Sequence, residues 1–88
     1  MISFDRAKAL AKERVAALAA TNGDEFVLED RTVEVHEGWV FFYNSRAFIQ
    51  TRNPIFGLAG NGPILVDRQG TVRHLPSGVP WRDEIRGT

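Results

Sequence analysis

Apolar residues recur at three- and four-residue spacing near the start of the chain and predict a helix there. The stripe consists of Phe4, Ala7, Ala11, Val15 and Leu18. Ser3 is suited to cap the amino end, and the acidic Asp5 in the first turn suits the helix dipole. The Asn22-Gly23 pair is a favourable stop signal. Because the stripe is rich in alanine, we expect this helix to approach a sheet closely.

From residue 26 the periodicity changes to that of β-strands. The segments FVLEDRTVEVH (26–36) and WVFFYN (39–44) are rich in β-branched and aromatic residues. They are separated by Glu37-Gly38, which predicts a two-residue hairpin loop. One face of the resulting hairpin is wholly apolar, and we expect it to lie under the helix. Its pairs are Val35 with Val40 and Val33 with Phe42.

The opposite face of this hairpin mixes aromatic residues with polar and charged ones. Its pairs are His36 with Trp39, Glu34 with Phe41 and Thr32 with Tyr43. Exposed aromatic side chains among charges are typical of a protein–protein interface. We therefore predict partner contacts here, with Trp39 either a binding anchor or a core residue. The candidate contact residues are Glu34, His36, Trp39, Phe41 and Tyr43.

A second hairpin is predicted from PILVDR (63–68) and TVRHL (71–75), with Gln69-Gly70 in its turn. Asp67 directly precedes this turn. It either caps the turn by accepting hydrogen bonds from backbone amides or contacts a partner. The pattern over residues 45–56 is ambiguous, and Asn53-Pro54 within it argues for a turn or an irregular excursion.

Together these elements predict an α+β fold of two layers. The N-terminal helix packs on an antiparallel sheet of about four strands. With 88 residues, the chain has the length of one domain, which we place at residues 1–88.

The glycine-rich run GLAGNGP (57–63) raises the possibility of a phosphate-binding loop. Gly57 and Gly62 have the spacing of the P-loop, but Pro63-Ile64 stands where that motif has Lys and Ser or Thr. The following residues resemble a strand, so no helix amino terminus is present to hold phosphate. We interpret the glycines as loop residues that permit positive φ angles, and Pro63 as the start of a strand. The residues with this structural role are Gly38, Gly60, Asn61, Gly62 and Pro63.

Composition excludes several function classes. Lys and Arg number 11 and so do Asp and Glu, so the net charge is zero and the basic surplus typical of nucleic-acid binders is missing. There are no cysteines, and the two histidines sit on different hairpins without a third ligand at metal-like spacing. We expect no cofactor, no metal and no catalytic residues. The charged N-terminal segment lacks a signal peptide or membrane span, which indicates a cytoplasmic protein.

Two ordered motifs resemble the immunity protein 35 family, also called YrhB-domain proteins. They are GWVFFYNS (38–45) and, about fifteen residues later, LAGNGPILVDR (58–68) followed by GTV (70–72). The resemblance spans nearly the whole chain. It implies an α+β, non-enzymatic bacterial protein, encoded beside a toxin that it neutralises by binding. Some relatives accompany papain-like toxins, and one branch is described as chaperone-like.

Three functions remain open from the sequence. The first is an immunity protein that occludes the active or substrate site of its cognate toxin. The second is a chaperone-like or structural module without a dedicated partner, and the third is a small enzyme. Exposed hydrophobic surface could also be covered in a homodimer. We expect neither nucleic acid nor membrane as a partner.

Overall fold

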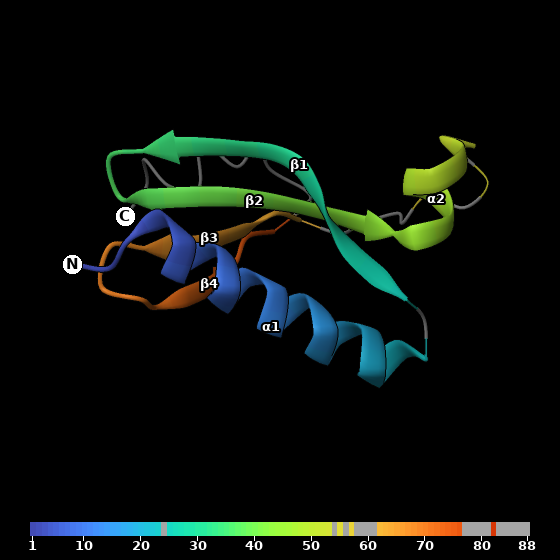
Figure 1. Cartoon of the computed structure of the whole chain (residues 1–88), viewed down its shortest axis with the longest axis horizontal. Helices are drawn as coiled ribbons and strands as arrows, with labels where there is room; N and C mark the ends of the chain where they lie inside the picture. Colours follow the sequence, from blue (N-terminus) through green and yellow to red (C-terminus); the bar gives the residue numbers. More distant parts are fainter. Residues whose placement is uncertain (24, 54, 56, 58–61, 77–81, 83–88) are drawn as a thin grey trace.

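A helix packed on one face of a four-stranded antiparallel sheet forms the body of the protein (Figure 1). The computed structural model describes residues 1–23, 25–53, 55, 57, 62–76 and 82. The strand order is β1-β2-β3-β4, and each neighbouring pair is antiparallel. The predicted α+β fold is confirmed. In chain order the elements are α1 (Phe4–Asn22), β1 (Phe26–Val35), β2 (Gly38–Ser45), α2 (Arg46–Thr51), β3 (Ile64–Asp67) and β4 (Val72–His74).

Helix α1 begins and ends where its local signals predict. The Ser3 hydroxyl accepts a hydrogen bond from the Arg6 amide at 3.1 Å, and Asp5 lies in the first turn. At the other end Gly23 adopts a left-handed conformation with φ of 71°, and its amide donates to the Ala19 carbonyl. Both caps satisfy backbone groups that the helix itself leaves unpaired.

The aromatic face of the sheet lies under α1. Ala7 and Ala11 are 0% exposed and pack with Val15 against this face. The expectation that α1 covers the valine face is therefore wrong. Because alanine carries no side chain beyond Cβ, the helix stripe leaves the space between the two layers to large side chains of the sheet. The sheet contributes Trp39, Phe41, Tyr43, Ile64 and Val66 to this core cluster.

The opposite, valine-rich face holds a second and smaller cluster. Val40, Leu65 and Leu75 are buried there. Val33, Val35 and Phe42 are half-buried and pack against them. Both faces of the β1–β2 hairpin therefore carry apolar side chains, which explains why its pattern alone does not identify the face that takes the helix.

The turn of the first hairpin lies one residue earlier than predicted. Val35 pairs with Gly38, so the loop consists of His36 and Glu37. Gly38 is instead a strand residue pressed against β3, because a Cβ at this position would lie 2.1 Å from the Val66 carbonyl oxygen. Each β1 residue from Thr32 to Val35 therefore pairs with a β2 residue two positions away from the predicted one. Because side chains alternate along a strand, a shift of two leaves the same residues together on each face.

Strand β1 contains a bulge. Leu28 pairs with Tyr43 and Thr32 pairs with Phe41, so the three residues between Leu28 and Thr32 oppose the single residue Phe42. The first half of β1 is thereby bent toward the carboxyl half of α1 (Figure 1).

The ambiguous segment after β2 begins with the short helix α2. Its cap is Ser45, whose hydroxyl accepts from the Phe48 amide at 3.1 Å. Ion pairs join this region to the start of β1. Arg46 lies 2.8 Å from Glu25, and Arg52 lies 3.3 Å from Glu29.

We predict that Gly38→Ala lowers the free energy of unfolding by about 3 kcal/mol, because its Cβ would collide with β3 backbone. Gly23→Ala serves as the control, since nothing lies within 4 Å of the added Cβ. The control costs only the left-handed conformation, about 1 kcal/mol. Urea unfolding followed by tryptophan fluorescence measures both. Equal losses in the two variants would contradict the close packing of β2 on β3.

Candidate protein-binding surface

The three aromatic residues predicted to face a partner are buried. Trp39 is 6% exposed, Phe41 is 1% and Tyr43 is 5%. The expectation of an exposed aromatic face is therefore wrong, and Trp39 is a core residue. The aromatic side chain at the edge of this cluster is Phe4 of α1, which is 40% exposed. Its ring lies 6.2 Å from that of Trp39 and 6.0 Å from that of Phe41.

The remaining predicted contact residues gather at one end of the sheet. The turns of both hairpins and the N-terminus meet there (Figure 1). Glu34 and His36 are exposed, and Asp67 is half-buried in the neighbouring turn. A shallow hollow of about 580 Å³ lies among these turns. We call this region the hairpin-end surface; its residues are Met1, Glu34, His36, Glu37, Asp67, Arg68 and Gln69.

Arg68 connects the two hairpins at this surface. Its Nη2 donates to the Val35 carbonyl at 2.8 Å and lies 3.2 Å from the Glu34 carboxylate. Its Nε donates to the His36 carbonyl at 3.1 Å. The guanidinium also stands 4.8 Å from the centre of the Trp39 ring, within range of a cation–π interaction. The planar guanidinium thus binds one strand end, one turn and one core ring together.

The backbone of Arg68 adds two further links. Its amide donates to the Glu37 carbonyl at 3.1 Å, and its carbonyl accepts from the Ile2 amide at 2.8 Å. This residue was not singled out from the sequence. Its position in the sequence could have identified it. Arg68 directly follows Asp67, the strand residue that pairs with Gly38, and so lies beside the turn of the first hairpin.

Asp67 caps the β3–β4 turn. Its Oδ1 accepts from the amides of Gln69 and Thr71, each at 2.9 Å. Its backbone carbonyl accepts from the amide of Gly70, which has φ of 93°. Of the two roles open from the sequence, the geometry shows the turn cap. This cap positions Arg68, the next residue, toward the first hairpin.

Tyr43 lies away from the hairpin-end surface, beside His74 and Gly62. The Nε2 of His74 is 2.9 Å from the Gly62 carbonyl oxygen and 3.2 Å from the Tyr43 hydroxyl. Because a carbonyl can only accept, we assign the ring proton to Nε2, which donates to Gly62. Burial raises the pKa of the Tyr43 phenol.

The glycine-rich motif is structural where the structure describes it. A Cβ on Gly62 would lie 1.7 Å from the Leu75 carbonyl oxygen, so only glycine fits this close approach. Pro63 directly precedes β3, and its carbonyl accepts from the Leu75 amide at 2.9 Å. Gly60 and Asn61 lie outside the described residues.

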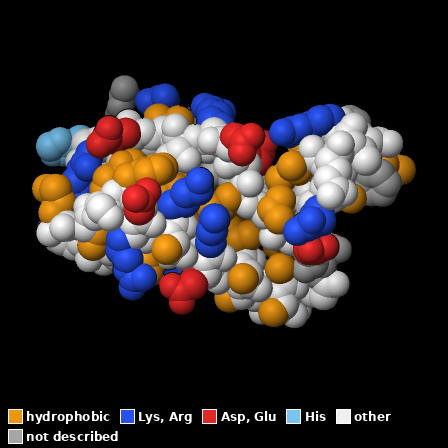
Figure 2. All heavy atoms as spheres, in the orientation of Figure 1, with side chains coloured by type: hydrophobic (Ala, Val, Ile, Leu, Met, Phe, Trp, Pro, Cys, Tyr) orange, Lys and Arg blue, Asp and Glu red, His pale blue; other side chains and the backbone are white. Residues whose placement is uncertain are grey.

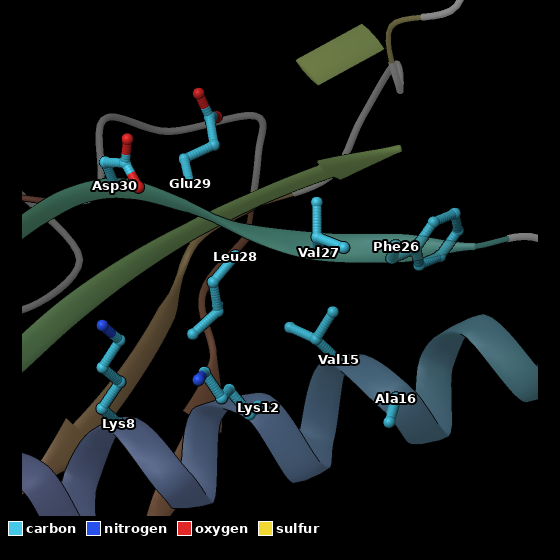
Figure 3. A pocket seen from close by; sticks show the side chains of 9 residues that line it. All are labelled: Lys8, Lys12, Val15, Ala16, Phe26, Val27, Leu28, Glu29 and Asp30. Atoms are coloured by element: carbon cyan, nitrogen blue, oxygen red, sulfur yellow. The ribbon is translucent and has the colours of Figure 1, made fainter. Parts of the chain in front are cut away.

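Two hollows lie between α1 and β1, and we refer to them together as the α1–β1 crevice. The hollow near the hairpin end measures about 330 Å³ and is lined by Phe4, Thr32, Glu34 and Trp39. Farther along, a second hollow of about 360 Å³ lies between the middle of α1 and the first half of β1 (Figure 3). Figure 2 shows hydrophobic side chains exposed among basic and acidic ones over this side of the molecule.

Within the described ranges, no group of three or more His, Asp or Glu side chains is placed to hold a metal ion. No helix in this part of the chain is long and apolar enough to cross a membrane.

We expect Arg68→Ala to lower the free energy of unfolding by about 2 kcal/mol, because it removes charge-assisted hydrogen bonds to two carbonyls. Glu34→Gln should cost less than about 1 kcal/mol, since its ion pair with Arg68 is exposed. Arg6→Ala, on the exposed side of α1, is the control and should stay within about 0.5 kcal/mol. Denaturant unfolding decides; an Arg68 variant as stable as this control would refute the link between the hairpins.

Tyr43 is the chain's single tyrosine, so its ionisation can be followed by near-ultraviolet absorbance of the phenolate. We predict a midpoint above the ordinary value of about 10 in the folded protein. The raised pKa contributes stability that is complete below the unfolded pKa and is lost as pH rises through the folded pKa. Tyr43→Phe should therefore lose less stability above pH ~10 than the parent. A phenolate midpoint at or below the ordinary value would contradict this.

Comparison with known proteins agrees with the motifs. The family model for immunity protein 35 matches residues 5–86. The "Uncharacterized protein YrhB" of Escherichia coli (strain K12) is 29% identical over 51 residues, which is 57% of this chain and 54% of YrhB. The chain thus spans about half the length of this curated relative. No solved structure gives a significant match. Since the family model covers nearly the whole sequence, the chain belongs to the immunity protein 35 family.

Proposed function

We propose that this protein is an immunity protein that binds a cognate protein toxin and blocks its active site or the approach of its substrate. The observation that carries the proposal is the match to the immunity protein 35 family over residues 5–86. The finer proposal is a papain-like toxin, as the resemblance of the two sequence motifs implies. In this function the protein acts by occupying surface and needs no catalytic group of its own.

The hairpin-end surface is the proposed site of contact. It presents the exposed side chains of Glu34 and His36 at fixed positions, because the Arg68 guanidinium donates hydrogen bonds to the Val35 and His36 carbonyls. A surface ordered before binding loses less conformational entropy in the complex. The half-exposed ring of Phe4 borders the same region, next to Glu34 in one hollow. An apolar centre bordered by charges is the usual composition of a protein interface.

The buried aromatic residues contribute to this proposal indirectly. Trp39 carries the Arg68 guanidinium on its ring, and Phe41 stacks on Phe4. They set the positions of the groups that face the partner. Exposed residues are therefore the informative ones to mutate.

Coexpression with the toxin encoded beside this gene tests the proposal. The intact chain should restore growth and inhibit the purified toxin. Combined Glu34→Lys and His36→Ala should weaken the measured Kd at least tenfold, because both exposed side chains change within the proposed contact. Glu13→Lys on the exposed side of α1 is the charge-matched control for Glu34→Lys and should bind as the parent does.

Two results would count against the proposal. Absence of any binding or protection by the parent chain would remove the immunity function, and protection of unrelated aggregating proteins would then favour a chaperone-like role. Full toxin binding by the folded double variant would remove the hairpin-end surface alone.

A further inference from the structure

The wider end of the α1–β1 crevice has an apolar floor. Val15 rises from α1, and Phe26 and Leu28 lie on the facing side of β1 (Figure 3). These side chains belong to the edge of the main core, where Phe26 and Leu28 remain half-buried. The bulge in β1 bends the strand at this place. The result is an open hollow of about 360 Å³ rather than a closed helix–sheet contact.

The helix wall of this hollow is basic. Lys8 and Lys12 are four residues apart, so they lie on the same side of α1, and both are exposed. Like charges at this spacing disfavour a helix. Neither lysine takes part in an ion pair with another described residue, whereas Arg46, Arg52 and Arg68 do.

No ion pair among the described residues joins the acidic side chains of the opposite wall to these lysines. Glu29 is paired with Arg52 of the α2 end at 3.3 Å. In Figure 3 the Glu29 carboxylate points away from α1, while the Lys8 ammonium extends from α1 toward β1. Asp30 lies on the β1 wall beside Glu29, at the exposed bulge. The hollow thus combines an apolar floor with two lysines on its helix wall that form no ion pair with a described residue.

We propose that this crevice receives an extended segment of the toxin in which a hydrophobic side chain is followed by an acidic one. The inference rests on the proposed immunity function and specifies the chemistry of its partner. The hydrophobic side chain would pack against Val15 and Leu28 at the floor of the hollow. The carboxylate would form ion pairs with Lys8 and Lys12. Complementary charge of this kind favours one partner and speeds association.

The placement of the two hollows one after the other along α1 suits a linear occupant. Its two hollows lie along α1 from Phe4 to Val15, eleven residues apart, which is roughly 16 Å at the helical rise. An extended chain covers that distance with about five residues. Such a segment would run from the crevice to Glu34 at the hairpin-end surface, so both regions would contact the same partner.

Reversal of the two lysine charges tests the inference. Combined Lys8→Glu and Lys12→Glu should weaken toxin binding at least tenfold at low salt. The difference from the parent should shrink as salt rises, because exposed charges are screened over about 8 Å at physiological ionic strength. Arg6→Glu with Arg14→Glu is the matched control, because it makes the same change in net charge on exposed positions of α1 outside the hollow. This control should retain parental affinity.

A partner-side experiment makes the assignment specific. Each acidic residue of the toxin is replaced by lysine in turn, and binding to the Lys8→Glu, Lys12→Glu variant is measured. Recovery of affinity by one toxin variant is the expected result. Failure of every replacement to restore binding, with the toxin variants folded, would overturn the inference.

The remaining outcomes separate this inference from the proposed function. If the parent binds the toxin and the lysine variant binds it equally well, the crevice is not the contact, and the immunity function stands. If the parent does not bind the toxin, both proposals fail. If light scattering shows a parental dimer that the lysine variant converts to monomer, the crevice holds a second copy of this chain, which overturns a toxin segment as its occupant.

Discussion

The contact of a small-residue helix stripe with an aromatic sheet face is the constraint on which the rest of the structure depends. Ala7 and Ala11 admit the helix close to the sheet, and Phe41 and its aromatic neighbours fill the layer between them. The stabilisation from dispersion and apolar burial at such a contact depends on how well the side-chain volumes fit together, and not on any one residue type. Once α1 occupies this face, the ring of Phe4 is left at the exposed edge of the same contact.

Local signals in the sequence were sufficient for the ends of the helix and the positions of the strands. Ser3 and Gly23 act through hydrogen bonds and dihedral angles within a few residues, so their roles can be predicted without knowing the fold. The face that takes the helix could not be predicted in this way. Both faces of the first hairpin are apolar, and the choice depends on β3, whose residues Ile64 and Val66 complete the aromatic side. Pairing between segments that lie far apart in the sequence leaves no signal in the local pattern of residues.

The candidate surface could be predicted only in part, because some of the contacts that form it are also distant in the sequence. Glu34 and His36 were identified because they alternate with the valines of β1, and they are exposed. Arg68 was missed because the residues that its side chain hydrogen-bonds lie more than thirty residues earlier in the chain. Gly38 was assigned to a turn by its residue type, whereas the proximity of β3 backbone requires glycine there. In each case the deciding neighbour comes from another hairpin.

The bulge of β1 has a consequence for how this fold can vary. It places three residues opposite one, an excess of two, so Leu28 and Thr32 on either side of it still face the same layer. An excess of one would rotate Phe26 and Leu28 out of the core, because strand side chains alternate. Insertions and deletions at this point are therefore compatible with the core only in pairs. The number of residues in this part of β1 can therefore change only by two at a time. Each such change can alter the bend of the strand, and with it the width of the crevice, without moving core side chains to the other face.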